Sequence, residues 1–337
     1  MTHPEDPDEP DVVPDPTDIA VGIDGSPTSA AALEWAMREA KLRDTKLRLF
    51  TAYNVPLAGY TASAGAYHDI LDGIRRAAEI AVSEALERAT DAGVDASGVI
   101  VEAEPVAALV EASNRYALLV VGSRAQGRFG SRMLGSVSAA LTGHTQCPTV
   151  IIPHPEAGGR ERSPEAGGRN SSPDAEPPPG PAVGVVTGVD GSTHAAAAAL
   201  VAAEYAQRRG LSLTVMWART PETTQIPYRL TEAEVAQIQS WTDNEAAWLK
   251  GHFPRLDISA RFEQQPPVEA LSRATATADL VVVGNRGRGG FAGLILGSTS
   301  QSLVHHMRGP VMVVPQNGNT VDPRLENRMH AMSHHLK

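Results

Sequence analysis

The chain contains the same pattern twice, and this internal repeat constrains its fold more than any other feature. The run AVGIDGSPTSAAAL at 20–33 returns as VTGVDGSTHAAAAAL at 186–200, and the run at 118–141 returns at 280–303. CPTVIIP at 147–153 returns, in the same order, as GPVMVVP at 309–315. The offset changes only from 166 residues at the first pair to 162 later on, which one loop deletion explains. The 337 residues therefore fold as two units of one architecture, each large enough to bury a core.

Within each copy, short apolar runs alternate with longer helical patterns. In the first copy we predict strands at 19–23, 47–52, 99–102, 118–121 and 148–152, with helices at 28–41, 69–92, from Pro105 onward and at 137–141. Several of the strands are apolar on both faces, which is typical of a parallel sheet covered by helices. The sequence therefore predicts an α/β protein with two tandem, doubly wound, parallel five-stranded sheets that carry helices on both faces. Trp241 and Trp248, seven residues apart on a helix of the second copy, are predicted to pack in its core.

Composition separates the two repeats, predicted at 18–153 and 183–315, from three other segments. Residues 1–17 are acidic and rich in proline, and we predict that they are disordered. Residues 154–182 hold seven prolines and five glycines with almost no large apolar residue, which predicts a flexible linker. The tail at 316–337 is predicted to be disordered on the same grounds. Its histidines, His330, His334 and His335, are more readily read as solvated than as metal ligands.

Charge and composition exclude several classes of function. There are 39 acidic residues against 29 Lys and Arg, so a nucleic-acid-binding protein, which needs a basic surface, is not expected. The single cysteine, Cys147, allows no internal disulfide and suits a reducing compartment. No apolar run is long enough to span a membrane, and the acidic amino-terminal segment is the reverse of a signal peptide. We therefore expect a cytoplasmic protein without a membrane partner.

Two motifs follow the strands at which a doubly wound sheet binds its ligands. The first strand of each copy ends in Asp-Gly-Ser, and the fourth ends in a glycine-rich loop. In the second copy this loop has the spacing G-x2-G-x9-G-S, formed by Gly284, Gly287, Gly297 and Ser298. Either motif alone is equally well explained as a tight turn. Because both recur at the carboxyl ends of predicted strands, where such sheets bind ligands, we interpret them as one site in each copy.

The chemistry of the loop suits an anion. Glycines let backbone N–H groups approach a phosphate closely, and Ser298 begins a helix whose amino-terminal end favours negative charge. Arg286 and Arg288 can add positive charge, although they can equally be solvated surface residues. No lysine follows a glycine loop, so the chain has no Walker A motif, and the dinucleotide motif G-x-G-x-x-G is absent after the first strand. No set of catalytic residues recurs in both copies, so we do not expect an enzyme.

Taken together, the strands VGIDGS and TGVDGS, the glycine loops and the closing strands CPTVIIP and GPVMVVP resemble the universal stress protein family. The tandem arrangement is similar to its two-domain actinobacterial members, and the resemblance covers residues 18–153 and 183–315. It implies sheets of strand order 3-2-1-4-5 that bind ATP, with Mg as a further candidate. Any hydrolysis of that ATP is expected to be slow and incidental. It also implies pairing of the two halves through their last strands, 148–152 and 310–314, inside one chain. A homodimer formed through the remaining surface is a further possibility that the sequence does not exclude.

The resemblance also assigns roles to individual residues. An acid facing adenine is implied at Asp24 and Asp190, each followed by Gly25 or Gly191, and backbone near Ala52 and Ala218 completes the adenine site. Phosphate contacts are implied at Gly122, Gly135, Ser136 and Val137 in the first copy, and at Gly284, Gly287, Gly297, Ser298 and Thr299 in the second.

One position departs from the family pattern, since the first copy has Ala125 where the second has Gly287. If this position needs a positive φ, alanine costs on the order of 1 kcal/mol. If its Cβ points at the ligand, the loss is larger. We therefore expect an ATP-binding stress-response switch whose second site is the stronger. The alternative is a nucleotide-free, dimeric interaction module of the same fold.

Overall fold

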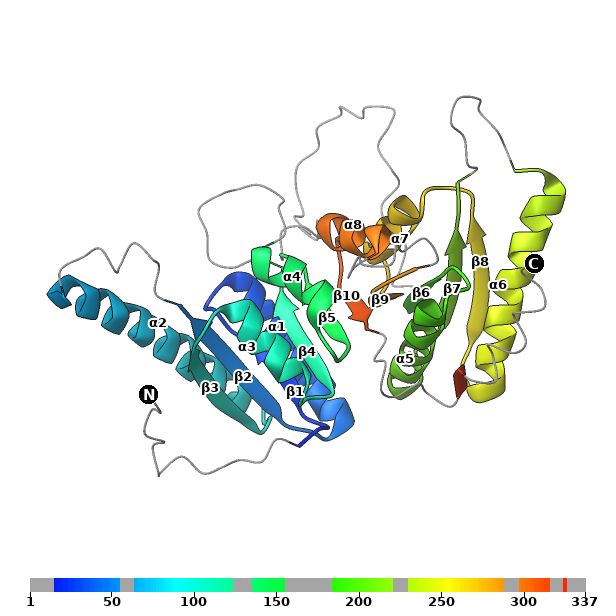
Figure 1. Cartoon of the computed structure of the whole chain (residues 1–337). Helices are drawn as coiled ribbons and strands as arrows, with labels where there is room; N and C mark the ends of the chain where they lie inside the picture. The colour runs from blue at the N-terminus through cyan, green and yellow to red at the C-terminus, as the bar shows by residue number, and fades with distance from the viewer. Residues whose placement is uncertain are drawn as a thin grey trace, which may run out of the picture.

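A computed structural model describes residues 15–54, 64–123, 135–154, 184–220, 230–287, 297–315 and 324–325 (Figure 1). The first half of the chain forms β1 (Ile19–Gly22), α1 (Pro27–Arg43), β2 (Leu47–Tyr53), α2 (Ala64–Asp91), β3 (Ala96–Glu102), α3 (Pro105–Ser113), β4 (Leu118–Gly122), α4 (Ser136–His144) and β5 (Thr149–Ile152). The second half forms β6 (Val185–Val189), α5 (Thr193–Arg209), β7 (Leu213–Ala218), α6 (Glu232–His252), β8 (Ile258–Glu263), α7 (Pro267–Thr275), β9 (Leu280–Gly284), α8 (Ser298–His306) and β10 (Val311–Val314). The two halves repeat one order of elements, as the internal repeat predicts.

The described strands form one continuous sheet in the order β3-β2-β1-β4-β5-β10-β9-β6-β7-β8. Each half has the predicted order 3-2-1-4-5, and all pairings within a half are parallel. The two five-stranded sheets join because β10 pairs antiparallel with β5, with Met312 opposite Val150. The predicted pairing of the last strands inside one chain is thus present.

Alternating strand residues build a separate core on each face of this sheet. Ile19 and Val21 of β1 contribute to one core, whereas Ala20 between them contributes to the other. The first core includes residues of α1, α2, α5 and α6, and the second includes residues of α3, α4, α7 and α8. Because the central strands are buried on both sides, they read as nearly continuous apolar runs in the sequence. The predicted helices on both faces are confirmed.

Helices α1 and α5 meet across the seam between the halves. The rings of Trp35 and Tyr205 stack with centroids 6.1 Å apart and planes inclined by 3°. Glu39 of α1 lies beside them with its side chain only 1% exposed, and it accepts a hydrogen bond from Arg209 of α5 at 2.8 Å. It also accepts one from Arg43 of its own helix at 2.6 Å. A buried carboxylate and two arginines therefore join the halves on this face.

The long helix α2 differs from its sequence prediction. The helical spacing of Ile70, Ile74, Ala77, Ala81, Ala85 and Ala89 predicts one buried face, but Ile70 is 42% exposed and Ala77 is also exposed. Ala85 and Ala89 of this set are buried, and Ala78 and Val82 are buried beside them. The helix begins beyond the edge of the sheet (Figure 1), so its first turns have no strand to pack against. The helical period was correct, but the place where packing begins was not.

The carboxyl-terminal segment was predicted to be disordered, and this is wrong for Arg324 and Leu325. The Arg324 guanidinium lies 2.7 Å from a carboxylate oxygen of Glu204 on α5 and 5.8 Å from the ring centroid of Phe253. Leu325 is 5% exposed and belongs to the core shared with α5 and α6. One apolar residue beside one cation is too short a pattern to be recognised in a polar tail. The histidines His330, His334 and His335 lie outside the described residues.

Candidate functional site

Each Asp-Gly-Ser sequence forms a tight corner between the first strand of its half and the next helix. The carboxylates of Asp24 and Asp190 accept hydrogen bonds at 2.9 Å from the backbone N–H groups of the serines two residues later. Gly25 and Gly191 between them have φ of 74° and 82°, a conformation that residues with a Cβ rarely adopt. The serine hydroxyls then cap α1 and α5. Both acids are therefore held at the carboxyl ends of β1 and β6.

Gly122 and Gly284 end the fourth strand of each half beside these corners. A Cβ on Gly122 would lie 2.7 Å from the backbone carbon of Thr28, and one on Gly284 would lie 2.9 Å from that of His194. These glycines allow the first turn of α1 or α5 to approach the end of the neighbouring strand. The expected role in phosphate contact is untested, and helix packing alone explains why both positions lack a side chain.

Gly287 lies against the acid of the second half. A Cβ at this position would be 2.5 Å from Oδ2 of Asp190, closer than real Cβ contacts. Its φ is outside the left-handed region, so the positive φ considered from the sequence is not its reason for being glycine. A side chain at this position would therefore have to displace the Asp190 carboxylate. Ala125, the matching residue of the first half, lies outside the described residues.

The third glycine of each loop begins a helix. Gly135 and Gly297 are the N-cap residues of α4 and α8, with φ of −66° and −76° and no side-chain cap. Each donates its N–H to the residue after the fourth strand, at 2.7 Å to Ser123 O and 2.8 Å to Asn285 O. The helix starts therefore lie beside the strand ends, as the spacing predicts. The first helical residues are the predicted Ser136 and Val137 in one half and Ser298 and Thr299 in the other.

Ala52 and Ala218 lie at the same edge of the sheet as these corners. Both come near the carboxyl ends of β2 and β7, the strands that flank β1 and β6. The Thr51 hydroxyl donates to Ile23 O at 2.8 Å, which ties the end of β2 to the residue before Asp24. The structure thus brings the predicted residues of each half together around one strand edge.

The sequence analysis missed two residues of this region, His194 and Asn285. His194 is the second residue of α5 and is half-buried. Burial lowers the pKa of its imidazole, Arg286 lowers it further, and Asp190 partly opposes them. Oδ1 of Asn285 is buried and has no hydrogen-bond partner within the described part of the chain. A comparison of the two repeats could have identified both as differences, because Thr28 of the first half aligns with His194 and Ser123 aligns with Asn285.

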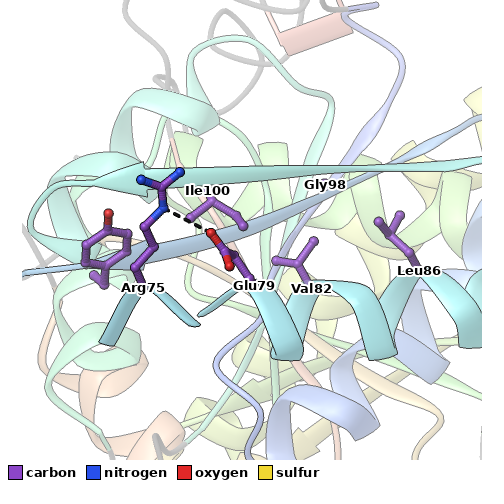
Figure 2. A pocket seen from close by; sticks show the side chains of 7 residues that line it. Arg75, Glu79, Val82, Leu86, Gly98 and Ile100 are labelled. Carbon is purple, nitrogen blue, oxygen red and sulfur yellow. Dashed lines mark hydrogen bonds and ion pairs between the residues drawn. The ribbon is translucent and has the colours of Figure 1, made fainter. Parts of the chain in front are cut away.

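A separate groove lies on the flank of the first half, between α2 and β3 (Figure 2). It has a volume of about 360 Å³, and Val82 and Leu86 point from the helix toward the strand that carries Gly98 and Ile100. Arg75 and Glu79 form an exposed ion pair at its rim, 3.0 Å apart. The groove has a mixed polar and aliphatic lining and contains none of the predicted site residues.

Comparison with known proteins adds to this geometry. The model of the universal stress protein family matches residues 17–153 and 184–315. The chain belongs to the universal stress protein family. Universal stress protein Rv1996 of Mycobacterium tuberculosis is 30% identical over 325 residues, which cover 89% of this chain and 96% of the relative. Universal stress protein Rv2623 of the same organism is 31% identical over 314 residues, with the same coverage.

The tandem universal stress protein fold also matches a solved structure along most of its length. A universal stress protein from Archaeoglobus fulgidus superposes with a TM-score of 0.60 at 20% identity, covering 90% of this chain and 97% of that one. None of the helices that the structure describes is both long and apolar enough to cross a membrane. Within the described ranges, no group of three or more His, Cys, Asp or Glu side chains could hold a metal ion.

Proposed function

We propose that this universal stress protein binds ATP at the carboxyl edge of its second half, and more weakly in its first. The bound nucleotide would bias the conformation or partners of the chain, and no chemical step is assigned to it. The observation that carries the proposal is the contact of Gly287 with Asp190, together with the glycine-capped start of α8 on the same loop. Gly297 lies close to Arg286, because a Cβ there would be 3.3 Å from its Cα. An acid, the backbone of an arginine and a helix start without a side-chain cap thus lie at one strand edge.

The residues divide into two ends of the proposed site. Asp190 and the backbone at Ala218 would face the adenine, a group that donates and accepts hydrogen bonds in its ring plane. The N–H groups at the start of α8, near Ser298 and Thr299, would bind the phosphates, because a helix amino terminus favours anions. A Mg ion would be held chiefly by phosphate oxygens. In this proposal ATP brings the negative charge and the adenine ring. The chain holds the ligand in place and offers groups of complementary charge.

The competing function is a nucleotide-free interaction module, and Ala125 favours it for the first half. By homology with Gly287, a methyl group there would be directed at Asp24. If the first half adopts the same backbone, its acid must move or the site must lose space. The proposal therefore assigns tight binding to the second half alone.

Two variants that each introduce a negative charge at a helix start test the site. Gly297→Asp places a carboxylate at the N-cap of α8, where aspartate stabilises a helix but repels a phosphate. We expect about one ATP per purified wild-type chain after denaturation and chromatography, and at least tenfold weaker ATP binding in the variant. Gly135→Asp, the same change in the first half, should leave the tight site intact.

The two functions give different outcomes in this experiment. Absence of nucleotide after purification, with no binding at millimolar ATP, would contradict the proposal and favour the interaction module. Equal losses from the two aspartate variants would contradict the assignment of tight binding to the second half. A thermal unfolding curve of each variant confirms that the helix caps are intact.

A further inference from the structure

His194 differs between the two halves at a position that both halves build in the same way. It aligns with Thr28, with the same offset of 166 residues that separates Asp24 from Asp190. In each half this residue packs its backbone over the glycine that ends the fourth strand, Gly122 or Gly284. The fold therefore holds a threonine at one candidate site and an imidazole at the other.

The surroundings of His194 disfavour a positive charge in the absence of a ligand. It is the second residue of α5, where the helix N–H groups and the helix dipole repel a cation. Arg286, from the loop after β9, lowers the pKa of the ring, and Asp190, after β6, raises it. These are the charged groups of the described chain that act on it most strongly, and burial outweighs both. The free protein therefore keeps His194 neutral near pH 7.

A phosphate at this edge reverses that balance. It would bring negative charge near Arg286 and the positive end of α5, so both repulsions on an imidazolium would be reduced. A neutral histidine would then gain a proton on binding and donate a charge-assisted hydrogen bond to the anion. The threonine of the first half can donate a hydrogen bond but cannot change its charge.

We propose that His194 takes up a proton when the phosphates of a nucleotide bind at the second site, and that it so strengthens binding at lower pH. This inference rests on the proposed ATP site. It adds a regulation of that site by pH, and it assigns to the first site no such dependence.

The test is a calorimetric titration of the full chain with ATP between pH 8 and pH 6. Repeating it in buffers of different ionisation enthalpy counts the protons taken up. If one proton is taken up on binding, the affinity for ATP rises by up to tenfold for each unit by which the pH falls. This holds between the pKa of the ring in the bound protein and its pKa in the free protein. We expect wild type to gain several-fold to tenfold more affinity over this range than His194→Thr, with net proton uptake only in wild type.

The variants separate His194 from other titrating groups. The terminal phosphate of ATP itself titrates near pH 6, and His194→Thr reports that contribution alone. His252→Gln, at an exposed histidine near the end of α6, should keep the full pH dependence of wild type. An NMR titration should show one ring resonance, absent in His194→Thr, whose pKa rises when ATP is added.

The outcomes are distinct. Equal pH slopes in wild type and His194→Thr, with ATP bound in both, would overturn the role of His194 and leave the ATP site standing. A ring pKa that does not rise on ATP addition would overturn it as well. Failure to bind ATP at every pH would overturn the proposed function itself, and this inference with it.

Discussion

At Gly287, one absent methyl group sets the space available to a carboxylate. Oδ1 of Asp190 is held by the N–H of Ser192, so the side chain has limited freedom to move away from a new Cβ. The same position is Ala125 in the first half. At this position the two halves therefore differ by a single carbon atom.

Exchanging this carbon tests that difference directly. Gly287→Ala should weaken ATP binding by several-fold to tenfold, because its Cβ would lie 2.5 Å from Asp190 Oδ2 unless the acid shifts. Ala125→Gly should strengthen the weaker site. Calorimetric titration of both single variants and of the double exchange measures the effect; an unchanged affinity in Gly287→Ala would show that the acid adapts freely.

Sequence reasoning at this scale found the position but not its cause. The glycine spacing identified Gly287, and of the two explanations offered from the sequence the positive φ is wrong. A Cβ directed at phosphates stays a prediction, and the sequence did not reveal the contact with Asp190. His194 and Asn285 were missed for a related reason. Their surroundings come from segments that are distant in sequence, so no local pattern marks them.

At the scale of elements, Glu39 shows how α1 and α5 are held together. Burial, the largest effect, raises the pKa of this carboxyl, but Arg43 and Arg209 outweigh it and the net pKa is lowered. A carboxyl with a lowered pKa stabilises the fold above its ordinary pKa of 4.5, and that contribution is lost as the pH falls through the lower value of the folded state. The contact of the two helices should therefore weaken in acid.

Glu39→Gln removes the charge that the two arginines share. We expect the free energy of unfolding to fall by about 3 kcal/mol near pH 7, because a buried ion pair loses one partner. The difference from wild type should shrink as the pH falls below 4.5 and through the lowered pKa of the folded state, because the carboxyl then takes up a proton. Urea unfolding from pH 7 into this acidic range measures it.

Glu79→Gln is the matched control, since Glu79 also pairs with an arginine four residues away but is 49% exposed. Its effect should stay below about 0.5 kcal/mol. Equal effects of the two variants would show that Glu39 contributes no more than a surface pair.

The elements themselves were largely predictable, because strands buried on both faces and alanine-rich helices have strong local patterns. The point along α2 at which its buried face begins was not, since it depends on where the sheet ends. The packing of Leu325 against the core was also not predictable, because a single apolar residue shows no helical or strand periodicity.

At the scale of the whole molecule, the seam combines a strand pairing with helix contacts. The β5–β10 ladder, the stacked Trp35 and Tyr205 rings and the Glu39–Arg209 pair all cross from one half to the other. None of these contacts depends on the covalent connection at 155–183. We therefore expect the halves to remain associated after that connection is cut.

A protease site inserted after Arg169 tests this expectation. The cut protein should elute from a sizing column as one species of the intact size, and should separate only in denaturant. Two species of about half the mass in native buffer would show that the seam is too weak to persist without the connection. The uncut insertion variant is the control for any effect of the inserted sequence.

The antiparallel β5–β10 pairing inside one chain also fixes the ratio of the two halves. Two separate proteins joined by the same strands would dissociate on dilution, whereas a tether replaces their concentration with a constant effective one. The two candidate sites are therefore always present one to one. Their ratio does not depend on the concentration of the protein, whether a cell holds many copies of it or only a few.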